Sequence, residues 1–192
     1  MYQESFVISM TKEKKDGFYV ELGSGDPYIE SNTLLLESEF GWKGLALEIE
    51  KSVAEKYNSS NRKNKCINAD ALEFDYKTYF EENNFPKNID FLQIDIDGHE
   101  HGNCLLALRR LPMLEYRFSV IIIEHDLGRN KKTKIELLAM RNAQRAILSS
   151  LGYKLIGQPP SEDWWVDPKQ IDDDAYKDDI FVGHPLQKIK NR

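Results

Sequence analysis

Cysteine is scarce in this sequence, and its two cysteines, Cys66 and Cys104, lie far apart. Neither belongs to a CxxC motif, which argues against a structural zinc site. A single disulfide between them is one alternative. Two buried thiols in a reducing compartment are the simpler interpretation.

The sequence also lacks long apolar runs. Residues 1–10 contain no basic stretch followed by an apolar segment, so we expect no signal peptide. No run approaches the roughly 20 apolar residues that a membrane-spanning helix needs. We therefore expect a cytoplasmic protein that does not insert into membranes.

Positive charge is in deficit, with 26 Lys and Arg against 32 Asp and Glu and a formal net charge of -6. Such a chain supplies no general phosphate-neutralising field, so we expect no nucleic-acid partner. Its 192 residues, 41% of them hydrophobic, suit one soluble domain with one core. The sequence leaves the oligomeric state open.

Strand-like and helix-like segments alternate along the chain, a pattern typical of a parallel sheet with helices on both faces. The expected strands are 18–22, 45–49, 65–68, 89–95, 119–124, 153–156 and 163–166. The expected helices are 33–40, with Ser31 or Asn32 as its cap, and 52–57, 76–82, 104–111 and 133–151. We predict a single α/β domain over residues 1–168, with a mostly parallel seven-stranded sheet and an antiparallel last strand. Residues 169–192 form an acidic C-terminal extension that either packs over the domain or adds to it.

A glycine-rich turn, Gly23-Ser24-Gly25, follows the first expected strand. Such a turn lets the backbone approach a ligand closely. A dinucleotide-binding fingerprint needs a third glycine, but Asp26-Pro27-Tyr28 follows here. Asp26 would also repel a pyrophosphate. A nicotinamide-dependent oxidoreductase is therefore the weaker interpretation.

Acidic residues surround the turn and end the next two strands. Glu21 and Asp26 suit a cation, and S-adenosylmethionine (SAM) carries a sulfonium and an ammonium but no phosphate. Glu48 ends the second strand, where a carboxylate can bind both ribose hydroxyls. The candidate cofactor-binding residues are Glu21, Gly23, Ser24, Gly25, Asn32, Glu48, Ile49, Asp70, Ala71 and Asp95.

Each of these acids also has a local alternative. Glu21 can cap an amide, and Glu48 can pair with Lys43 or Lys51. Asp70 either meets the adenine edge, together with the amide of Ala71, or caps the segment that follows. Three acids at three successive strand ends favour the ligand interpretation, because these ends meet at one edge of the sheet.

A second acidic cluster follows the fourth and fifth strands. We predict that Asp95, Glu124 and His125 are catalytic, with one of them acting as a general base. The same three residues could instead hold a divalent metal such as Mg²⁺. The alternative for Asp95 and Asp97 is that they accept backbone amides in their turn. The pair Trp164-Trp165 either lines a substrate pocket or belongs to the core.

Several segments together resemble the FkbM-like family of SAM-dependent methyltransferases. The segments are 17–26 (GFYVELGSGD), Ser31-Asn32-Thr33, 40–44 (FGWKG) leading to Glu48, 89–100 (IDFLQIDIDGHE), Glu124-His125, 152–155 (GYKL) and 162–166 (EDWWV). The resemblance covers about residues 3–168 and implies a Rossmann-like class I methyltransferase fold. By position it implies that Glu21, Gly23, Gly25, Glu48 and Asp70 bind the cofactor, and that Asp95, Asp97 and Glu124 face the transfer site. Two departures are Ile49 in place of the family's usual proline and Asp97 where the family often has Glu.

The expected activity is SAM-dependent methyl transfer to a hydroxyl of a small polar, sugar-like or polyketide-like acceptor. The family resemblance adds glycans to these acceptors. The alternative is a SAM-binding module without catalysis that acts as a partner or scaffold subunit. The presence of both Asp95 and Glu124 favours the enzyme.

Overall fold

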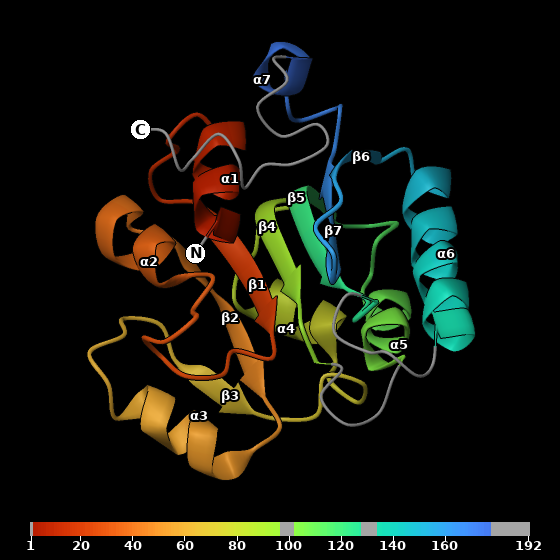
Figure 1. Cartoon of the computed structure of the whole chain (residues 1–192). Coiled ribbons are helices and arrows are strands. Elements are labelled where there is room, and N and C mark those ends of the chain that lie inside the picture. Colours follow the sequence, from red (N-terminus) through yellow and green to blue (C-terminus); the bar gives the residue numbers. More distant parts are fainter. Residues whose placement is uncertain (1, 97–101, 128–133, 178–192) are drawn as a thin grey trace.

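A seven-stranded sheet with the order β3-β2-β1-β4-β5-β7-β6 forms the centre of the molecule (Figure 1). The structure is a computed structural model that describes residues 2–96, 102–127 and 134–177. The strands are β1 (Phe18–Leu22), β2 (Lys43–Glu48), β3 (Cys66–Asn68), β4 (Asn88–Ile94), β5 (Arg117–Glu124), β6 (Lys154–Gly157) and β7 (Glu162–Val166). The helices are α1 (Tyr2–Met10), α2 (Leu34–Phe40), α3 (Lys51–Asn58), α4 (Tyr76–Glu82), α5 (Asn103–Arg110), α6 (Lys134–Ser150) and α7 (Asp174–Lys177).

The strand order confirms the predicted architecture. Strands β1 to β5 pair in parallel, and β7 is antiparallel between β5 and β6. The chain runs outward from β1 through β2 to β3, and then crosses back so that β4 pairs with the other side of β1. This reversal opens a crevice between β1 and β4 at the carboxyl edge of the sheet, where open α/β sheets bind their ligands.

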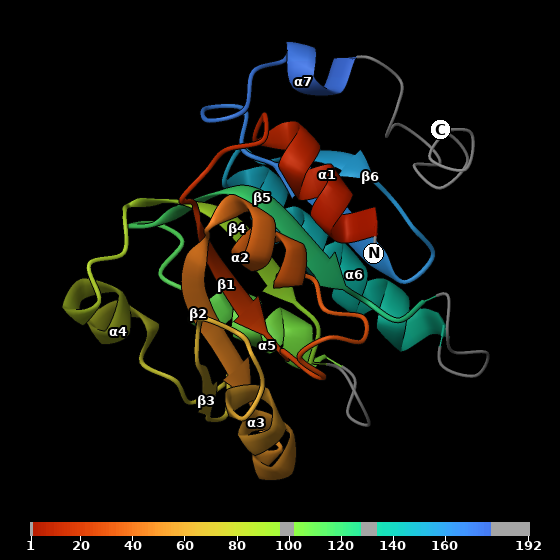
Figure 2. The ribbon, with the colours of Figure 1, turned by 90° about the vertical axis from the view of Figure 1, so that its left-hand side faces the viewer.

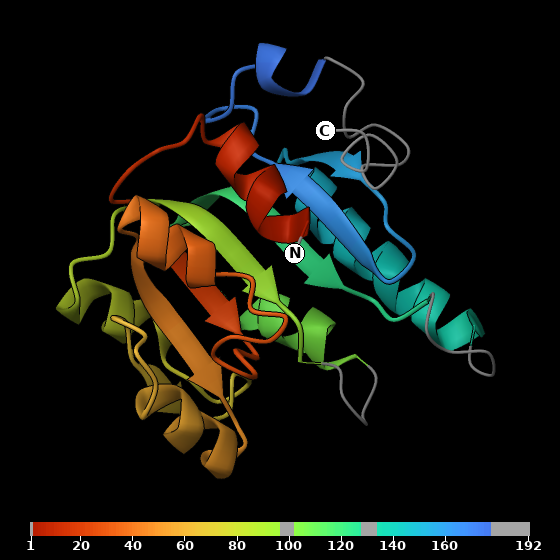
Figure 3. The same cartoon turned by 60° about the vertical axis from the view of Figure 1, so that its left-hand side comes forward.

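Helices cover both faces of the sheet (Figure 3). On one face α4, α5 and α6 enclose the larger apolar core, which contains Leu22, Phe80 and Ile121. On the other face α1 and α2 pack over a second core with Tyr19 and Trp164. Figure 2 shows α3 beside β3 at the edge of the sheet. Side chains alternate between the two faces along each strand, so one strand contributes to both cores.

Helix α1 lies before the first predicted element of the sequence. It buries Phe6, Val7 and Met10 in the second core, and the ring of Phe6 lies 4.7 Å from that of Trp164. Its Glu4 accepts a hydrogen bond of 2.6 Å from the backbone N–H of Leu35. Burial raises the pKa of Glu4, although this bond lowers it. Helix α1 therefore supplies a partner for the start of α2.

The start of α2 differs from the prediction. Thr33, rather than Ser31 or Asn32, precedes the first helical residue, and it makes no side-chain cap bond. Its hydroxyl instead donates to Glu21 at 2.8 Å. The cap prediction was wrong because Glu4, a residue of a different helix, accepts from the backbone N–H of Leu35 at the start of α2.

The described part of the C-terminal extension packs on the α1 side of the sheet. Ile171 and Tyr176 are buried in the second core. Residues 178–192 of this extension lie outside the described residues. Within the part of the chain that is described, no helix is both long enough and apolar enough to cross a membrane.

Candidate active site

A cavity of about 620 Å³ lies at the carboxyl edge of β1, β2, β3 and β4. This volume is within the range of small-molecule and cofactor sites. Among the predicted cofactor residues, those that line the cavity are Gly23, Ser24, Gly25, Asn32, Glu48, Ile49, Asp70, Ala71 and Asp95. The register of the parallel strands brings these residues together from four separate loops.

The two glycines of the turn have different structural roles. Gly23 has φ +84°, and a Cβ on it would lie 2.0 Å from the backbone carbonyl oxygen of Asp95. The packing of the protein itself thus requires a residue without a side chain at position 23. Gly25 has φ +57°, and nothing lies within 4 Å of where its Cβ would be. Because Gly25 lines the cavity, it leaves room there.

Glu48 is held in place by backbone amides. One carboxylate oxygen accepts from the N–H of Gly25 at 3.1 Å, and the other accepts from the N–H of Glu50 at 2.9 Å. Each carboxylate oxygen can accept a further hydrogen bond. The predicted alternative partners, Lys43 and Lys51, do not bond to it, since Lys51 pairs with Glu55 and Lys43 starts a strand as an exposed residue. Asp70 likewise accepts from the N–H of Leu72 at 2.8 Å.

Glu21 does not line the described cavity. It is 1% exposed and bonded to the Thr33 hydroxyl, and burial raises its pKa to about 7. Asp26 does line the cavity, but Lys56 lies 2.5 Å from it and lowers its pKa to about 2. The charge of these two acids is thus less available to a cation than the sequence suggested. Glu30, Glu48, Asp70 and Asp95 also line the cavity, and we expect their carboxylates to provide most of its attraction for a cation.

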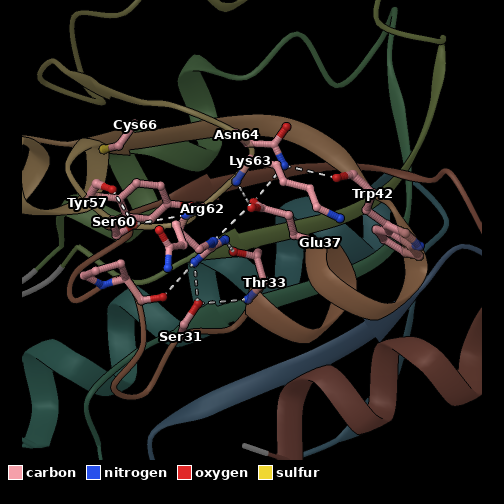
Figure 4. Close-up of polar contacts among 12 residues, drawn as sticks. Ser31, Thr33, Glu37, Trp42, Tyr57, Ser60, Arg62, Lys63, Asn64 and Cys66 are labelled. Carbon is pink, nitrogen blue, oxygen red and sulfur yellow. Dashed lines mark hydrogen bonds and ion pairs between the residues drawn. The ribbon is translucent and has the colours of Figure 1, made fainter.

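Arg62 is a residue that sequence reasoning missed. It is 5% exposed and lies at the centre of a polar network between α2 and the segment that joins α3 to β3 (Figure 4). Its Nε donates to Glu37 at 3.2 Å, and its guanidinium lies over the ring of Tyr57. Glu37 also accepts from Asn64 at 2.8 Å and from the backbone N–H of Lys63. No local motif marks this residue, because its partners are distant in the sequence.

The three predicted catalytic residues do not occupy equivalent places. Asp95 lines the cavity, whereas Glu124 and His125 are buried residues outside its described lining. His125 Nδ1 accepts from the N–H of Leu127 at 3.3 Å, and its Nε2 lies 3.7 Å from Asp163. Both ring nitrogens of His125 therefore already face protein groups.

The residues around His125 form a buried charged cluster. Burial would raise the pKa of Asp163, but its two bonds of 2.7 Å to Arg145 and its contact with His125 outweigh this and lower it. Asp126, which follows His125, is buried, and its backbone lies in the left-handed region at φ 56°. Backbone strain of this kind clusters at functional sites.

The predicted metal site is not supported. Among the described residues, no group of three or more His, Cys, Asp and Glu side chains is placed to hold a metal ion. Asp95, Glu124 and His125 are all described, and they do not form such a group. Asp97, predicted to lie near the transfer site, is outside the described residues.

The tryptophan pair belongs to the core. Trp164 is 1% exposed, contacts Phe6 and donates to Glu162 at 2.8 Å. Trp165 is 2% exposed and packs in the larger core on the opposite face. Neither residue lines the described cavity.

Solved structures share this fold. A SAM-dependent methyltransferase from Aquifex aeolicus superposes with a TM-score of 0.54 at 14% identity, over 85% of this chain and 88% of that one. The plantazolicin methyltransferase BpumL, solved with S-adenosylhomocysteine (SAH), gives 0.52 at 13% identity, over 86% and 81%. A putative rRNA methylase from Clostridium thermocellum gives 0.52 at 9% identity, over 86% and 95%. The chain therefore has the Rossmann-like fold of the class I methyltransferases.

The sequence assigns the family within that class. The methyltransferase FkbM domain matches residues 11–155. The chain belongs to the FkbM methyltransferase family, as its sequence segments indicated. No curated protein sequence matches it.

Proposed function

We propose that the chain is a SAM-dependent methyltransferase that binds SAM in the cavity at the carboxyl edge of the sheet. One observation carries this proposal. The described lining contains Asp26, Glu30, Glu48, Asp70 and Asp95, and no Lys, Arg or His. Carboxylates attract the sulfonium and ammonium groups of SAM, whereas a pyrophosphate calls for positive partners. Family membership supports the same cofactor.

The lining residues divide among the parts of the cofactor. Glu48 is the ribose ligand, because its carboxylate is already oriented by two backbone amides and keeps further acceptor capacity. Asp70 and Ala71 meet the adenine, next to the apolar side chain of Ile49. The backbone of Gly23 to Gly25, with Ser24 and Asn32, receives the methionine half.

When bound, SAM supplies an electrophilic methyl group. The chain's own contribution is to bind and orient the acceptor and to take a proton from its hydroxyl. Asp95 is the proposed general base, since it directly follows β4 and lines the cavity. Orientation supplies much of the rate in such a displacement, so a modest base suffices. Glu124, at the end of the neighbouring strand, is the second candidate. His125 is a weaker candidate, because both of its nitrogens are engaged.

The proposed reaction is O-methylation of a small polar, sugar-like or polyketide-like acceptor. Isothermal titration calorimetry with SAH tests the cofactor. We expect saturable binding in the micromolar range, and no heat at millimolar SAH would overturn the proposal. An NADH fluorescence titration provides the contrast, with no binding expected.

Catalysis is tested separately from binding. Transfer of a labelled methyl group to a panel of sugars, glycans and polyketide hydroxyls identifies the acceptor, and Asp95→Asn should lower kcat on it about 100-fold. SAH binding without transfer to any member of a broad panel would favour the non-catalytic module.

A further inference from the structure

Residues 26–33 form one wall of the cavity and contain no helix or strand. Asp26, Ile29, Glu30 and Asn32 of this wall line the cavity. A segment without regular structure has no hydrogen-bond ladder of its own, so its shape depends on contacts with the rest of the protein.

These contacts come from outside the cavity. Lys56 pairs with Asp26 at 2.5 Å, and the backbone N–H of Asn61 donates to the hydroxyl of Tyr28 at 2.8 Å. Both donors belong to the stretch of chain that includes α3 and leads to β3. The wall is thus held in place by hydrogen bonds from a segment about 30 residues further along the chain.

Arg62 makes the largest number of these contacts (Figure 4). Its Nη1 donates to the carbonyl oxygen of Pro27 at 3.1 Å and to the hydroxyl of Ser31 at 3.0 Å. Its Nη2 donates to the hydroxyl of Thr33 at 2.7 Å. Ser31 and Thr33 flank Asn32, which lines the cavity, so one guanidinium bonds the hydroxyls of the residues on both sides of a lining residue.

The guanidinium itself is rigidly held. Its Nε donates to Glu37, and its Cζ lies 4.6 Å from the ring centroid of Tyr57. The Arg62 and Glu37 side chains are 1% and 2% exposed. In such a buried pair each member satisfies the other, and removal of one leaves an uncompensated charge. The network continues to Glu21 through the Thr33 hydroxyl, at 2.8 Å.

We propose that Arg62 is a positioning residue for the cofactor cavity, which holds the 26–33 wall in its binding shape without lining the cavity itself. This inference rests on the proposed function, because it takes SAM as the occupant. Without Arg62 the wall must be ordered when the ligand binds, and this cost appears as lost affinity. Arg62 is thus a determinant of affinity in a segment that provides no lining residue.

Arg117 offers a matched control within the same chain. It donates to Asp167 at 2.8 Å and to the carbonyl oxygen of Leu151 at 2.9 Å, and it lies over the ring of Tyr153 at 4.3 Å. It thus combines the same kinds of contact as Arg62. It lies at the start of β5, at the opposite end of the strands from the cavity.

Two measurements on Arg62→Leu and Arg117→Leu test the proposal. Without ligand, amide hydrogen exchange of residues 26–33 should accelerate at least tenfold in Arg62→Leu and stay unchanged in Arg117→Leu. SAH affinity should fall about tenfold or more in Arg62→Leu and less than twofold in Arg117→Leu. Equal losses in both variants, or an unchanged wall in Arg62→Leu, would overturn it.

A second pair keeps the test decisive if Arg62→Leu does not fold. Thr33→Val removes the hydroxyl that links Arg62 to Glu21, and Thr33→Ser retains it. We expect weaker SAH binding and faster exchange of the wall only in Thr33→Val. Equal behaviour of the two variants would refute the positioning role. If the wild-type protein binds no SAH, the cofactor proposal fails, while the exchange measurement still decides whether Arg62 holds the wall.

Discussion

Gly23 faces the backbone carbonyl of Asp95 so closely that a Cβ on the glycine would lie 2.0 Å from the carbonyl oxygen. Next to this contact, the N–H of Asp95 donates to the carbonyl of Leu22 at 3.0 Å. The ends of β1 and β4 are therefore joined directly beneath the cavity. The fold therefore requires a glycine at position 23, whereas Gly25 lines the cavity and has no atom within 4 Å of where its Cβ would be.

Alanine substitutions should separate these two roles. Gly23→Ala meets backbone that cannot move aside, so we expect severe destabilisation, on the order of 3 kcal/mol or more. Gly25→Ala meets no atom within 4 Å and should cost only about 1 kcal/mol for its positive φ. Gly25→Ala should nevertheless weaken SAH binding about tenfold, because its methyl group is added at the cavity. Thermal unfolding and calorimetry of both variants check this prediction, which fails if Gly23→Ala is as stable as Gly25→Ala.

Glu21 should give the protein a specific pH dependence. Its pKa is raised to about 7 by burial, so between its unfolded pKa and pH 7 the folded state binds more protons than the unfolded state. Its contribution to stability is fully present at low pH and is lost as the pH rises toward and through 7. Glu21→Gln removes this loss. The difference in unfolding free energy between Glu21→Gln and the wild type should therefore increase, in favour of the variant, by about 2–3 kcal/mol from pH 5 to pH 8.

Denaturant unfolding at several pH values measures this difference. The exposed Glu73→Gln removes the same formal charge and serves as the control. A constant difference between Glu21→Gln and the wild type across this pH range would show that Glu21 titrates normally in the folded state.

Glu48 should carry a large share of the cofactor affinity. Glu48→Ala removes a carboxylate that is oriented by the amides of Gly25 and Glu50, and we expect a loss of about 1.5–3 kcal/mol in SAH binding. The neighbouring Glu50→Ala leaves its own N–H in place and should bind SAH normally. Calorimetry on the two variants is the measurement, and equal affinities would remove Glu48 from the site.

Chelation should leave cofactor binding unchanged. Of Asp95, Glu124 and His125, which the sequence predicts as alternative metal ligands, only Asp95 lines the described cavity. We expect SAH affinities within twofold of each other in EDTA and in excess Mg²⁺. A tenfold loss in EDTA that Mg²⁺ restores would contradict this expectation.

The sheet was predictable from the sequence because each strand carries its own signal. The apolar run at residues 119–124 marks a central parallel strand, and glycines and acids mark the strand ends. The cavity lining was predictable for the same reason, because parallel strand ends must meet at one edge. Helix α1 was missed, since its apolar residues become informative only once Trp164 and the sheet are present to cover them.

The network around Arg62 was not predictable from one sequence. Its bonds join residues 25 to 35 positions apart, and each partner alone resembles an ordinary surface residue. The role of Glu21 as a cofactor residue stays a prediction. The pleat of β1 turns its side chain toward the face that α2 covers, where the Thr33 hydroxyl donates to it, and Glu21 does not line the described cavity.

Within the 26–33 wall, the residues that bond to Arg62 differ from those that line the cavity, which has a consequence for engineering. The contacts with Arg62 use Pro27, Ser31 and Thr33, and none of them uses the side chain of Ile29 or Glu30. Ile29 is 69% exposed, and both residues line the cavity. Ile29 can therefore be replaced without loss of these contacts, whereas Glu30 has φ 58° and favours glycine or asparagine as its replacement. They are positions at which substitutions can enlarge the cavity for synthetic cofactors larger than SAM.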